Sequence, residues 1–435
     1  MDVAVPAASA AGLEEPGLTA RYWASFVLIV ALLVCEIFDF FLVGFLVSAV
    51  APKWGLTYGQ STIILLAAGL GSIFGALGFG WAADRRGRKF AIVGGALVCS
   101  LAAGAIALIP ERAWLLFAAL RFVVGVGYGG AGSSQFALIT EMTPTRLRTV
   151  MTSSMGVPAG LGVVAASAAV ATLFHLLGWR GVAALCAAPA ALALVIALVV
   201  PESAKWRAAA GSGGKTLPKA PPLTRLREAL AEPRRFWLIV LIQLGMGSCL
   251  TGVLLWGPTI TGQLLQVPTQ QAAAWFTWVT AAGLVGRVLF VFLPLKLGRV
   301  GAGMLMGYGG GASLVLAALF HDAFLGAAPA FLVFLALGEL LYDGGFSNVN
   351  PYAPELFPVR TAALGTGIAS AAGGAGKILG PIALGLIAGA HNLVSPKATE
   401  HAVLPAFLFL GFSCLLAGAA YQFLGVETHQ RPLRD

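Results

Sequence analysis

Long apolar stretches separated by short polar segments recur along the whole 435-residue chain. A helix that crosses a bilayer needs about 20 mostly apolar residues. Such runs lack the alternation of barrel strands, and hydrocarbon does not tolerate unpaired backbone groups, so helices are expected. The pattern predicts an all-α membrane protein with twelve transmembrane helices, at 22–50, 61–82, 90–109, 114–137, 150–173, 181–200, 236–262, 272–293, 302–320, 327–350, 363–390 and 403–424.

Composition agrees with this pattern. Apolar residues make up 58% of the chain and charged residues only 10%, whereas about a quarter of the residues of a soluble domain are charged. The five cysteines lie scattered through the predicted spans without metal-ligand spacing, which is typical of small packing residues. We therefore expect no disulfide, no bound metal and no cofactor.

A basic segment rich in Gly, Pro and Lys, from about 201 to 235, has the composition of a linker and divides the spans six and six. The predicted organisation is a cytoplasmic tail (1–21), a six-helix half (22–200), a central cytoplasmic loop (201–235), a second six-helix half (236–424) and a cytoplasmic tail (425–435).

The two halves resemble each other in sequence. A shift of 214 residues aligns EMTPTR, which holds Glu141 and Arg146, with ELFPVR, which holds Glu355 and Arg360. The same shift pairs Tyr128 with Tyr342, as well as 130 with 344 and 133 with 347. This register predicts parallel repeats, an arrangement in which the substrate site lies near the bilayer midplane between the halves.

Basic residues gather on one side of the predicted topology. Twenty lie in the termini and the loops that share their face, and four lie in the opposite loops. The positive-inside rule then places both termini and the central loop in the cytoplasm of a multi-pass inner (plasma) membrane protein. The net charge of +9 is therefore explained by topology and not by nucleic-acid binding.

Seven charged residues lie inside the predicted spans: Glu36, Asp39, Arg121, Arg287, Glu339, Asp343 and Lys377. Spacings of three and four put each acid pair within about 60° and 40° on its helix. Two carboxylates in a low dielectric do not both ionise cheaply, so one of each pair is expected to carry a proton. The alternatives are purely structural salt bridges for the four acids and Arg121, and snorkelling for Arg287.

The loop after the second span reads GWAADRRGRK, from Gly80 to Lys89. It resembles the signature of the major facilitator superfamily at every defined position. That resemblance implies two six-helix halves and a cytoplasmic gate, for which the candidates are Asp84, Arg85, Arg88, Glu141, Arg146, Glu355 and Arg360. The matching loop of the second half, Leu295 to Arg299, lacks the acid.

The first span narrows the resemblance. Glu36-Ile-Phe-Asp39 is similar to the D-G-F-D signature of aromatic acid and proton symporters, with Glu and Ile replacing Asp and Gly. PES at 201–203 and VETHQ at 426–430 resemble the sugar-porter wing and mark helix ends. The fifth span lacks the Gly-Pro pair of antiporters, which favours import.

The resemblance implies roles for the charged residues. It makes Asp39 and Glu36 the first candidates for proton coupling, with Glu339 and Asp343 behind them, and it makes Lys377 a ligand for a substrate anion. Arg121 is expected either to neutralise the acids or to bind a substrate carboxylate. Three aromatic residues could stack on a substrate ring, although packing is the more common role: Tyr128, Tyr342 and Trp256.

The expected function is proton-coupled uptake of a small organic anion, such as an aromatic carboxylate, by a monomer in the lipid bilayer. A sugar, polyol or nicotinate-like carrier, an efflux pump and an uncoupled facilitator are the transport alternatives. An enzyme would need a nucleophile with its base, a metal cluster or a phosphate-binding loop, and the sequence has no such pattern.

Overall fold

The computed structural model describes residues 18–144, 147, 151, 154–204, 206–207, 232–357 and 362–428, without the side chains of 84, 133, 354 and 362–367. The first half consists of α1 (Ala20–Trp54), α2 (Tyr58–Arg86), α3 (Arg88–Ala105), a 3-10 turn (Ile106–Leu108), α4 (Trp114–Met142), α6 (Gly156–Leu185) and α7 (Pro189–Val199).

The second half is built in the same way. It consists of α10 (Pro233–Leu264), α11 (Thr269–Phe292), α12 (Pro294–Met304), a π-helical turn (Leu305–Gly309), α13 (Gly310–Leu319), a hairpin of β1 (Phe324–Leu325) and β2 (Ala328–Pro329), α14 (Ala330–Tyr342), α15 (Phe346–Glu355), α16 (Ala362–Ile387) and α17 (Pro396–Leu424).

Eleven helical segments of the described residues are long and apolar enough to cross a membrane. One of them, 156–199, is 44 residues long, which at about 1.5 Å per residue is twice the thickness of a bilayer core. Its backbone turns at Gly178, where φ is 61°. This segment therefore holds the fifth and sixth of the twelve expected spans.

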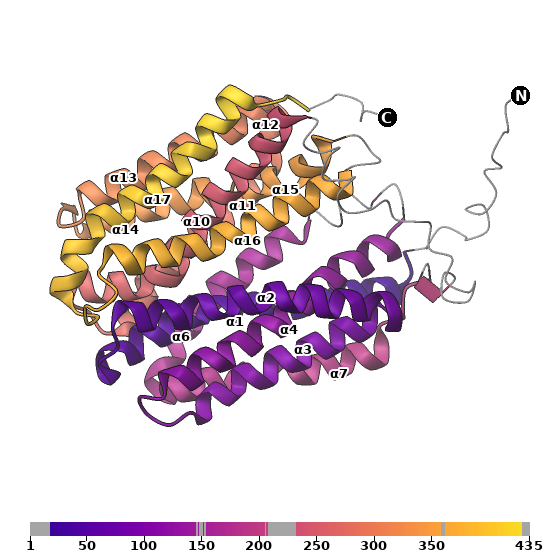
Figure 1. The fold of residues 1–435 in the computed structure, drawn as a ribbon, viewed down its shortest axis with the longest axis horizontal. Helices are drawn as coiled ribbons and strands as arrows, with labels where there is room; N and C mark the ends of the chain where they lie inside the picture. The colour runs from indigo at the N-terminus through magenta and orange to yellow at the C-terminus, as the bar shows by residue number, and fades with distance from the viewer. Residues whose placement is uncertain are drawn as a thin grey trace, which may run out of the picture.

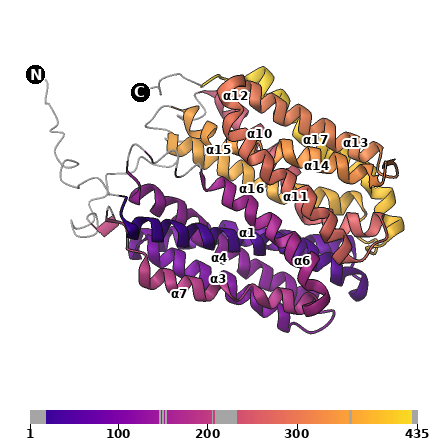
Figure 2. The ribbon, with the colours of Figure 1, turned by 180° about the vertical axis from the view of Figure 1, so that it is seen from behind.

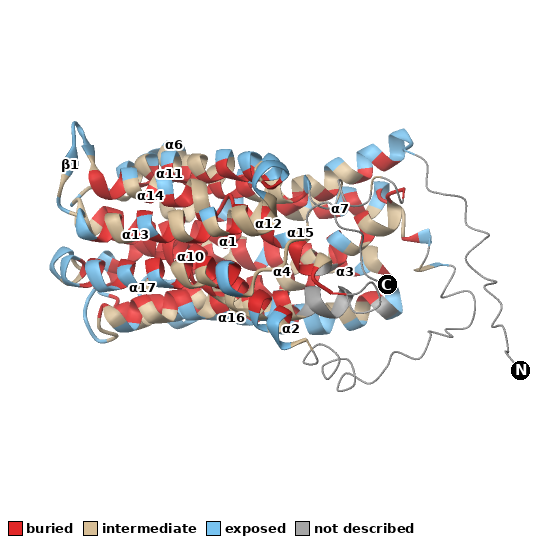
Figure 3. Cartoon of the chain, turned by 90° about the horizontal axis from the view of Figure 1, so that it is seen from above, coloured by how far each residue is buried: buried red, intermediate tan, exposed pale blue. Residues whose placement is uncertain are grey.

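The two halves form separate bundles that lie side by side (Figure 1). They meet where α1 packs on α10, α2 on α16 and α6 on α11, and Figure 2 shows the α6 and α11 contact from behind. Figure 3 shows buried residues along α1 and α10, and exposed residues on the outer helices and at both ends. We call the end with Ala20 and Leu424 the termini end and the end with Trp54 and Val394 the far end.

Short, well-capped turns hold the helix ends in place. At the far end Gly55 adopts a left-handed conformation, with φ 64°, and Thr57 forms a capping box with Gln60. At the termini end the repeat recurs in the backbone, because Gly87 and Gly298 both have positive φ, 104° and 71°. Each of these two glycines turns the chain between consecutive spans of its own half.

Close helix packing relies on glycine. A methyl group on Gly125 of α4 would collide with the backbone of Ala68 on α2.

The tenth span is divided into α14 and α15 by a turn at Asp343–Gly345. Such interrupted helices in transporters line the substrate pathway, and this interruption begins at an intramembrane acid.

Candidate functional site

A buried ion pair joins α1 to α4 in the first half. Arg121 is 1% exposed, and its Nη1 lies 3.0 Å from Oδ2 of Asp39. The same guanidinium donates to the backbone carbonyls of Asp39 and Phe40, at 3.4 and 3.2 Å. Charge and carbonyl dipoles together compensate for burying the cation, so Arg121 acts as the counter-charge of Asp39 in this conformation.

The second acid of α1 has a neutral partner. Gln135 of α4 donates from Nε2 to Oε2 of Glu36 at 2.9 Å. Both side chains are buried, 0% and 3% exposed, and Oε1 of each has no hydrogen-bond partner among the described residues. Glu36 and Asp39 therefore lie together, as expected, but their surroundings differ.

An aromatic pair lies between these polar contacts along the α1 and α4 interface. The rings of Phe40 and Tyr128 have centroids 5.2 Å apart at 36°. Arg121, Tyr128 and Gln135 follow one another at seven-residue intervals, which places all three on one face of α4. Tyr128 is half-buried, so it is the most accessible of the three aromatic residues considered for ring stacking.

The second half has its own buried ion pair, between α11 and the break in the tenth span. Arg287 donates from Nε and Nη2 to the two carboxylate oxygens of Asp343, at 2.7 and 2.6 Å. Such two-pronged contacts are among the strongest that proteins make. The remaining Nη1 donates to the carbonyl of Gly156, at 2.8 Å. Since Gly156 begins α6, this arginine connects the two halves.

Glu339 lies one turn before Asp343 and accepts a hydrogen bond from the hydroxyl of Tyr342. A methyl group on Gly283 of α11 would stand 2.9 Å from both Glu339 Cγ and Asp343 Oδ2. The two acids thus share one face against α11, as the spacing predicts. Tyr342 is 0% exposed in this conformation and serves that cluster.

Lys377 is half-buried in the middle of α16, beside the contact of that helix with α10. Its carbonyl accepts from Thr251 at 3.2 Å. Among the described residues no carboxylate lies within ion-pair distance of its amine. Arg287 is close enough to act on it electrostatically. An unpaired interior cation of this kind is a ready ligand for an anion.

At the termini end, each half carries the same acid and arginine contact. Arg88 lies 3.5 Å from Glu141, and Arg299 lies 2.8 Å from Glu355. Two further carboxylates bind backbone N–H groups just after the glycine turns at Gly87 and Gly298: Glu202 those of Arg88 and Lys89, and Glu427 those of Arg299 and Val300. Anions are stabilised at a helix N-terminus, which explains why PES and VET mark helix ends.

The remaining gate candidates lie elsewhere or outside the description. Arg85 stacks on the ring of Trp81, with its guanidinium 3.9 Å from the centroid, and belongs to the exposed surface. Arg146, Arg360 and the side chain of Asp84 lie outside the described residues. The partner of Glu355 is Arg299.

The far end is closed across the two halves. The α1–α2 turn pairs by its backbone with the α16–α17 turn: Tyr58 donates to Asn392, Gly59 to Ala390 and Val394 to Leu56, at 2.9, 2.9 and 3.1 Å. We call this contact the far-end seal.

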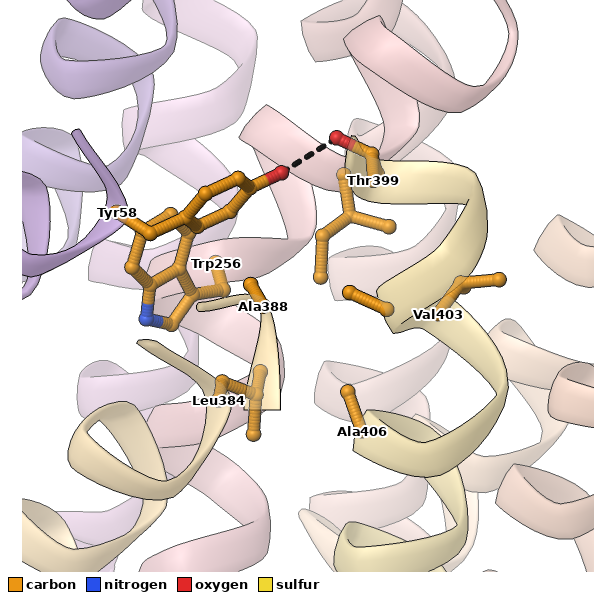
Figure 4. Close-up of a pocket in the computed structure, with 9 residues that line it drawn as sticks. Tyr58, Trp256, Leu384, Ala388, Thr399, Val403 and Ala406 are labelled. Atoms are coloured by element: carbon orange, nitrogen blue, oxygen red, sulfur yellow. Dashed lines mark hydrogen bonds between the residues drawn. The ribbon is translucent and has the colours of Figure 1, made fainter. Parts of the chain in front are cut away.

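Side chains reinforce the seal (Figure 4). Tyr58 lies against Trp256, with centroids 5.3 Å apart, and its hydroxyl points to Thr399 at 2.5 Å. The indole of Trp256 donates to the carbonyl of Pro381 at 3.2 Å. The cavity that they line is small, about 10 Å³, and its lining is mostly apolar. Trp256 therefore belongs to the seal in this conformation.

The sequence matches the family model of the Major Facilitator Superfamily over residues 29–338. The chain belongs to this family, and it is a multi-pass membrane transporter and not an enzyme.

Among curated relatives, the 4-hydroxybenzoate transporter PcaK of Pseudomonas aeruginosa is 33% identical over 191 residues, which is 43% of this chain and only 42% of that protein. The niacin transporter NiaP of Acinetobacter baylyi is 26% identical over 91% of both chains. The cis,cis-muconate transport protein of the same species is 24% identical over 89% of both.

Solved structures share the fold. A bacterial homologue of the human lysosomal transporter Spinster, in an inward-facing and occupied conformation, superposes with a TM-score of 0.74 at 17% identity, covering 94% of this chain and 97% of that one. The xylose transporter XylE of E. coli, in an inward open conformation, gives 0.71 at 18% identity, covering 95% and 98%. At these identities the likeness concerns the fold alone.

Sequence reasoning missed several residues that the structure brings into the site: Gln135, Tyr58, Thr399 and the carbonyl of Gly156. Gln135 shares the seven-residue stripe of Arg121 and Tyr128 on α4, and that stripe is a signal that could have found it. Backbone carbonyls and turn contacts have no comparable signature.

Proposed function

We propose that this transporter takes up a small organic anion, such as an aromatic carboxylate, together with a proton, by alternating access. Lys377 is the main ligand of the substrate anion, with Arg121 as a second one, and Tyr128 is the side chain that stacks on a ring. Glu36 and Asp39 couple transport to protons, and Glu339 and Asp343 form a second proton-sensitive pair beside Arg287.

The observation that carries this proposal is Lys377, an interior cation without an ion pair in the described part of the chain. A charge in the bilayer centre costs at least about 2.5 kcal/mol on insertion scales, and such residues commonly serve a substrate pathway. A neutral substrate gives no reason to keep it there. Three relatives are named as transporters of organic acids: 4-hydroxybenzoate, niacin and muconate.

Coupling follows from counting charges in the first half. Glu36 and Asp39 lie beside one cation, Arg121, which pairs with Asp39, so one negative charge is left over when both acids ionise. A single bound proton makes the cluster neutral, which is the cheaper state in a low dielectric. Binding of that proton also removes the surplus negative charge of the cluster, so it favours binding of the substrate anion.

The basic loops and this topology support a location in the cytoplasmic membrane with both termini inside. The termini end is then the cytoplasmic end and the far-end seal faces outward. The gate would comprise the contacts of Arg88 with Glu141 and of Arg299 with Glu355, together with Asp84, Arg85, Arg146 and Arg360.

The test is uptake into proteoliposomes of labelled 4-hydroxybenzoate, niacin, muconate and xylose under an imposed inward proton gradient. We expect one acid to accumulate, and a protonophore to abolish the accumulation. Asp39→Asn should lose accumulation, and Lys377→Met should raise KM at least about tenfold, the equivalent of about 1.4 kcal/mol, while Lys377→Arg retains binding. Accumulation of xylose alone, or of an acid without any effect of Lys377→Met, would contradict the proposal.

A nicotinate-like carrier is the second candidate. It is favoured by the niacin transporter relative, whose similarity extends over 91% of both chains. The same panel of substrates separates the two candidate functions. A nicotinate-like carrier should need a lower concentration of niacin to inhibit uptake of 4-hydroxybenzoate than the leading proposal expects.

A further inference from the structure

We propose that Gln135 is a positioning residue that prepares Glu36, and not Asp39, to hold the coupled proton. The inference rests on the proposed proton-coupled function and specifies which acid of the α1 pair carries the proton and what holds it in place. It is drawn from the hydrogen bonding of the two acids, which differs although they are neighbours on one helix face.

Asp39 is the worse proton acceptor of the two in this conformation. Its Oδ2 lies 3.0 Å from Nη1 of Arg121, and the guanidinium is fixed further by the carbonyls of Asp39 and Phe40. Protonating Asp39 would leave a buried cation without its counter-charge. Removal of one partner from a buried ion pair is strongly unfavourable.

Glu36 has no such cation. The described residues give it one hydrogen bond, from Gln135, and Oε1 is buried without a partner. An ionised carboxylate with a buried oxygen that no described residue pairs is costly, whereas a protonated carboxyl group needs fewer hydrogen bonds. The arrangement therefore suits a carboxyl group that is neutral before transport and gives its proton up when water reaches it.

Gln135 supplies orientation without charge. Its amide fixes one oxygen of Glu36 and leaves the other for the proton. Because the amide donates to the carboxylate, it also limits how tightly the proton is held. A cation here would favour the ionised form of Glu36, and an apolar residue would favour its protonated form. The amide leaves both states within reach.

The other ionisable groups around Glu36 do not remove this distinction. They are Asp39 and Cys35 on α1, Arg121 and Tyr128 on α4, and Cys99 on α3. Other helices also pack on α1. Cys186 lies where α6 and α7 meet. α10 carries Arg234 and Arg235 where it begins, at the termini end, and Cys249 within the span. α2 has Tyr58 at the far end and its arginines at the termini end, and α11 carries Arg287, bound to Asp343.

The experiment compares Gln135→Met, which keeps the length of the side chain and removes the donor, with the wild type in proteoliposomes. Gradient-driven uptake and substrate exchange of the accumulated acid are measured from pH 5 to 9. Loss of a hydrogen bond to a carboxylate favours the protonated form, so we expect the alkaline limb of the uptake profile to move up by about one pH unit. Ser134→Ala, a buried neighbour on α4, is the matched control and should leave the limb in place.

Should Gln135→Met bind no substrate, Gln135→Glu replaces it. A second carboxyl beside Glu36 favours a shared proton, and the limb should again move up. An unshifted limb in a variant that still exchanges substrate overturns the inference. So does Glu36→Gln with normal accumulation. Failure of the wild type to accumulate any acid refutes instead the proposed function, so the two failures are distinguishable.

Discussion

The two halves of the transporter each bury an arginine against an acid, but they use the arginine differently. Arg121 directs its described hydrogen bonds to α1, inside the first half. Arg287 is held by Asp343 through two donors and reaches the carbonyl of Gly156 in the other half with a third. The first pair therefore lies within one half, whereas the second joins the two halves.

This difference suggests a division of labour. A self-contained pair beside an extra acid, Glu36, is suited to bind a proton without disturbing the contact between halves. A pair that bridges the halves would be strained or released if the halves moved relative to each other. Repeat symmetry did not produce both pairs, because the 214-residue shift that aligns the tenth span with the fourth places Leu335 opposite Arg121.

The largest effect is expected from Arg121→Met. It leaves two buried carboxylates without a cation, so we expect a loss of about 3–5 kcal/mol of stability and no transport. Thermal unfolding in detergent measures the first and uptake the second. The double variant Arg121→Met with Asp39→Asn should recover most of the stability, and failure to recover it would show that Arg121 has an essential partner outside α1.

Asp343→Asn tests the bridging pair. Loss of the carboxylate weakens the hold on Arg287, and transport should fall at least about tenfold because the contact with Gly156 loses its geometry. The distribution of distances between spin labels on α6 and α11 should become broader. Asp39→Asn is the counterpart and should leave those distances unchanged. Broadening in both variants, or in neither, would remove the distinction between the halves.

A smaller effect is expected at the termini end. Glu355 binds Arg299 through both of its oxygens, at 2.8 and 3.2 Å, whereas Glu141 lies 3.5 Å from Arg88. Glu355→Gln should therefore destabilise the protein by about 1 kcal/mol and Glu141→Gln by less. Melting temperatures at low and high salt decide the point, and a larger loss for Glu141→Gln would reverse the ranking.

The smallest effect concerns the far-end seal. Tyr58→Phe removes the hydrogen bond to Thr399 and keeps the ring beside Trp256, so opening should become easier by no more than about 1 kcal/mol. Reactivity of a cysteine placed at Ala402, which lines the enclosed cavity, reports the opening. Thr399→Val should raise the reactivity of this cysteine by as much as Tyr58→Phe does. A large increase in reactivity in either variant would mean that side chains dominate the seal.

Much of the fold was accessible from the sequence because hydrophobic length and loop charge are direct physical requirements of a bilayer. The expectation of twelve helices in two halves is consistent with the structure, and helical spacing correctly placed Glu36 with Asp39 and Glu339 with Asp343. The mutual position of helices is a different matter. That Asp39 meets Arg121, while Glu36 meets Gln135 fourteen residues further along α4, depends on how α1 crosses α4.

Two parts of the site were beyond the sequence for a simpler reason. The acceptor for Arg287 in the other half is the backbone carbonyl of Gly156. Every residue has such a carbonyl, so the sequence does not mark this one. Trp256 reads as a possible stacking residue from its type alone. Its neighbour Tyr58 is almost two hundred positions away, and only the meeting of two far-end turns joins them.

The far-end seal is made largely of main chain. Three of its hydrogen bonds join backbone N–H and carbonyl groups of turns from opposite halves, and these groups are present whatever side chains the turns carry. The side chains of these turns can therefore change during evolution while the backbone contacts that close the far end persist. A closure made of main-chain groups lets the residues around the far end diverge without loss of this contact between the halves.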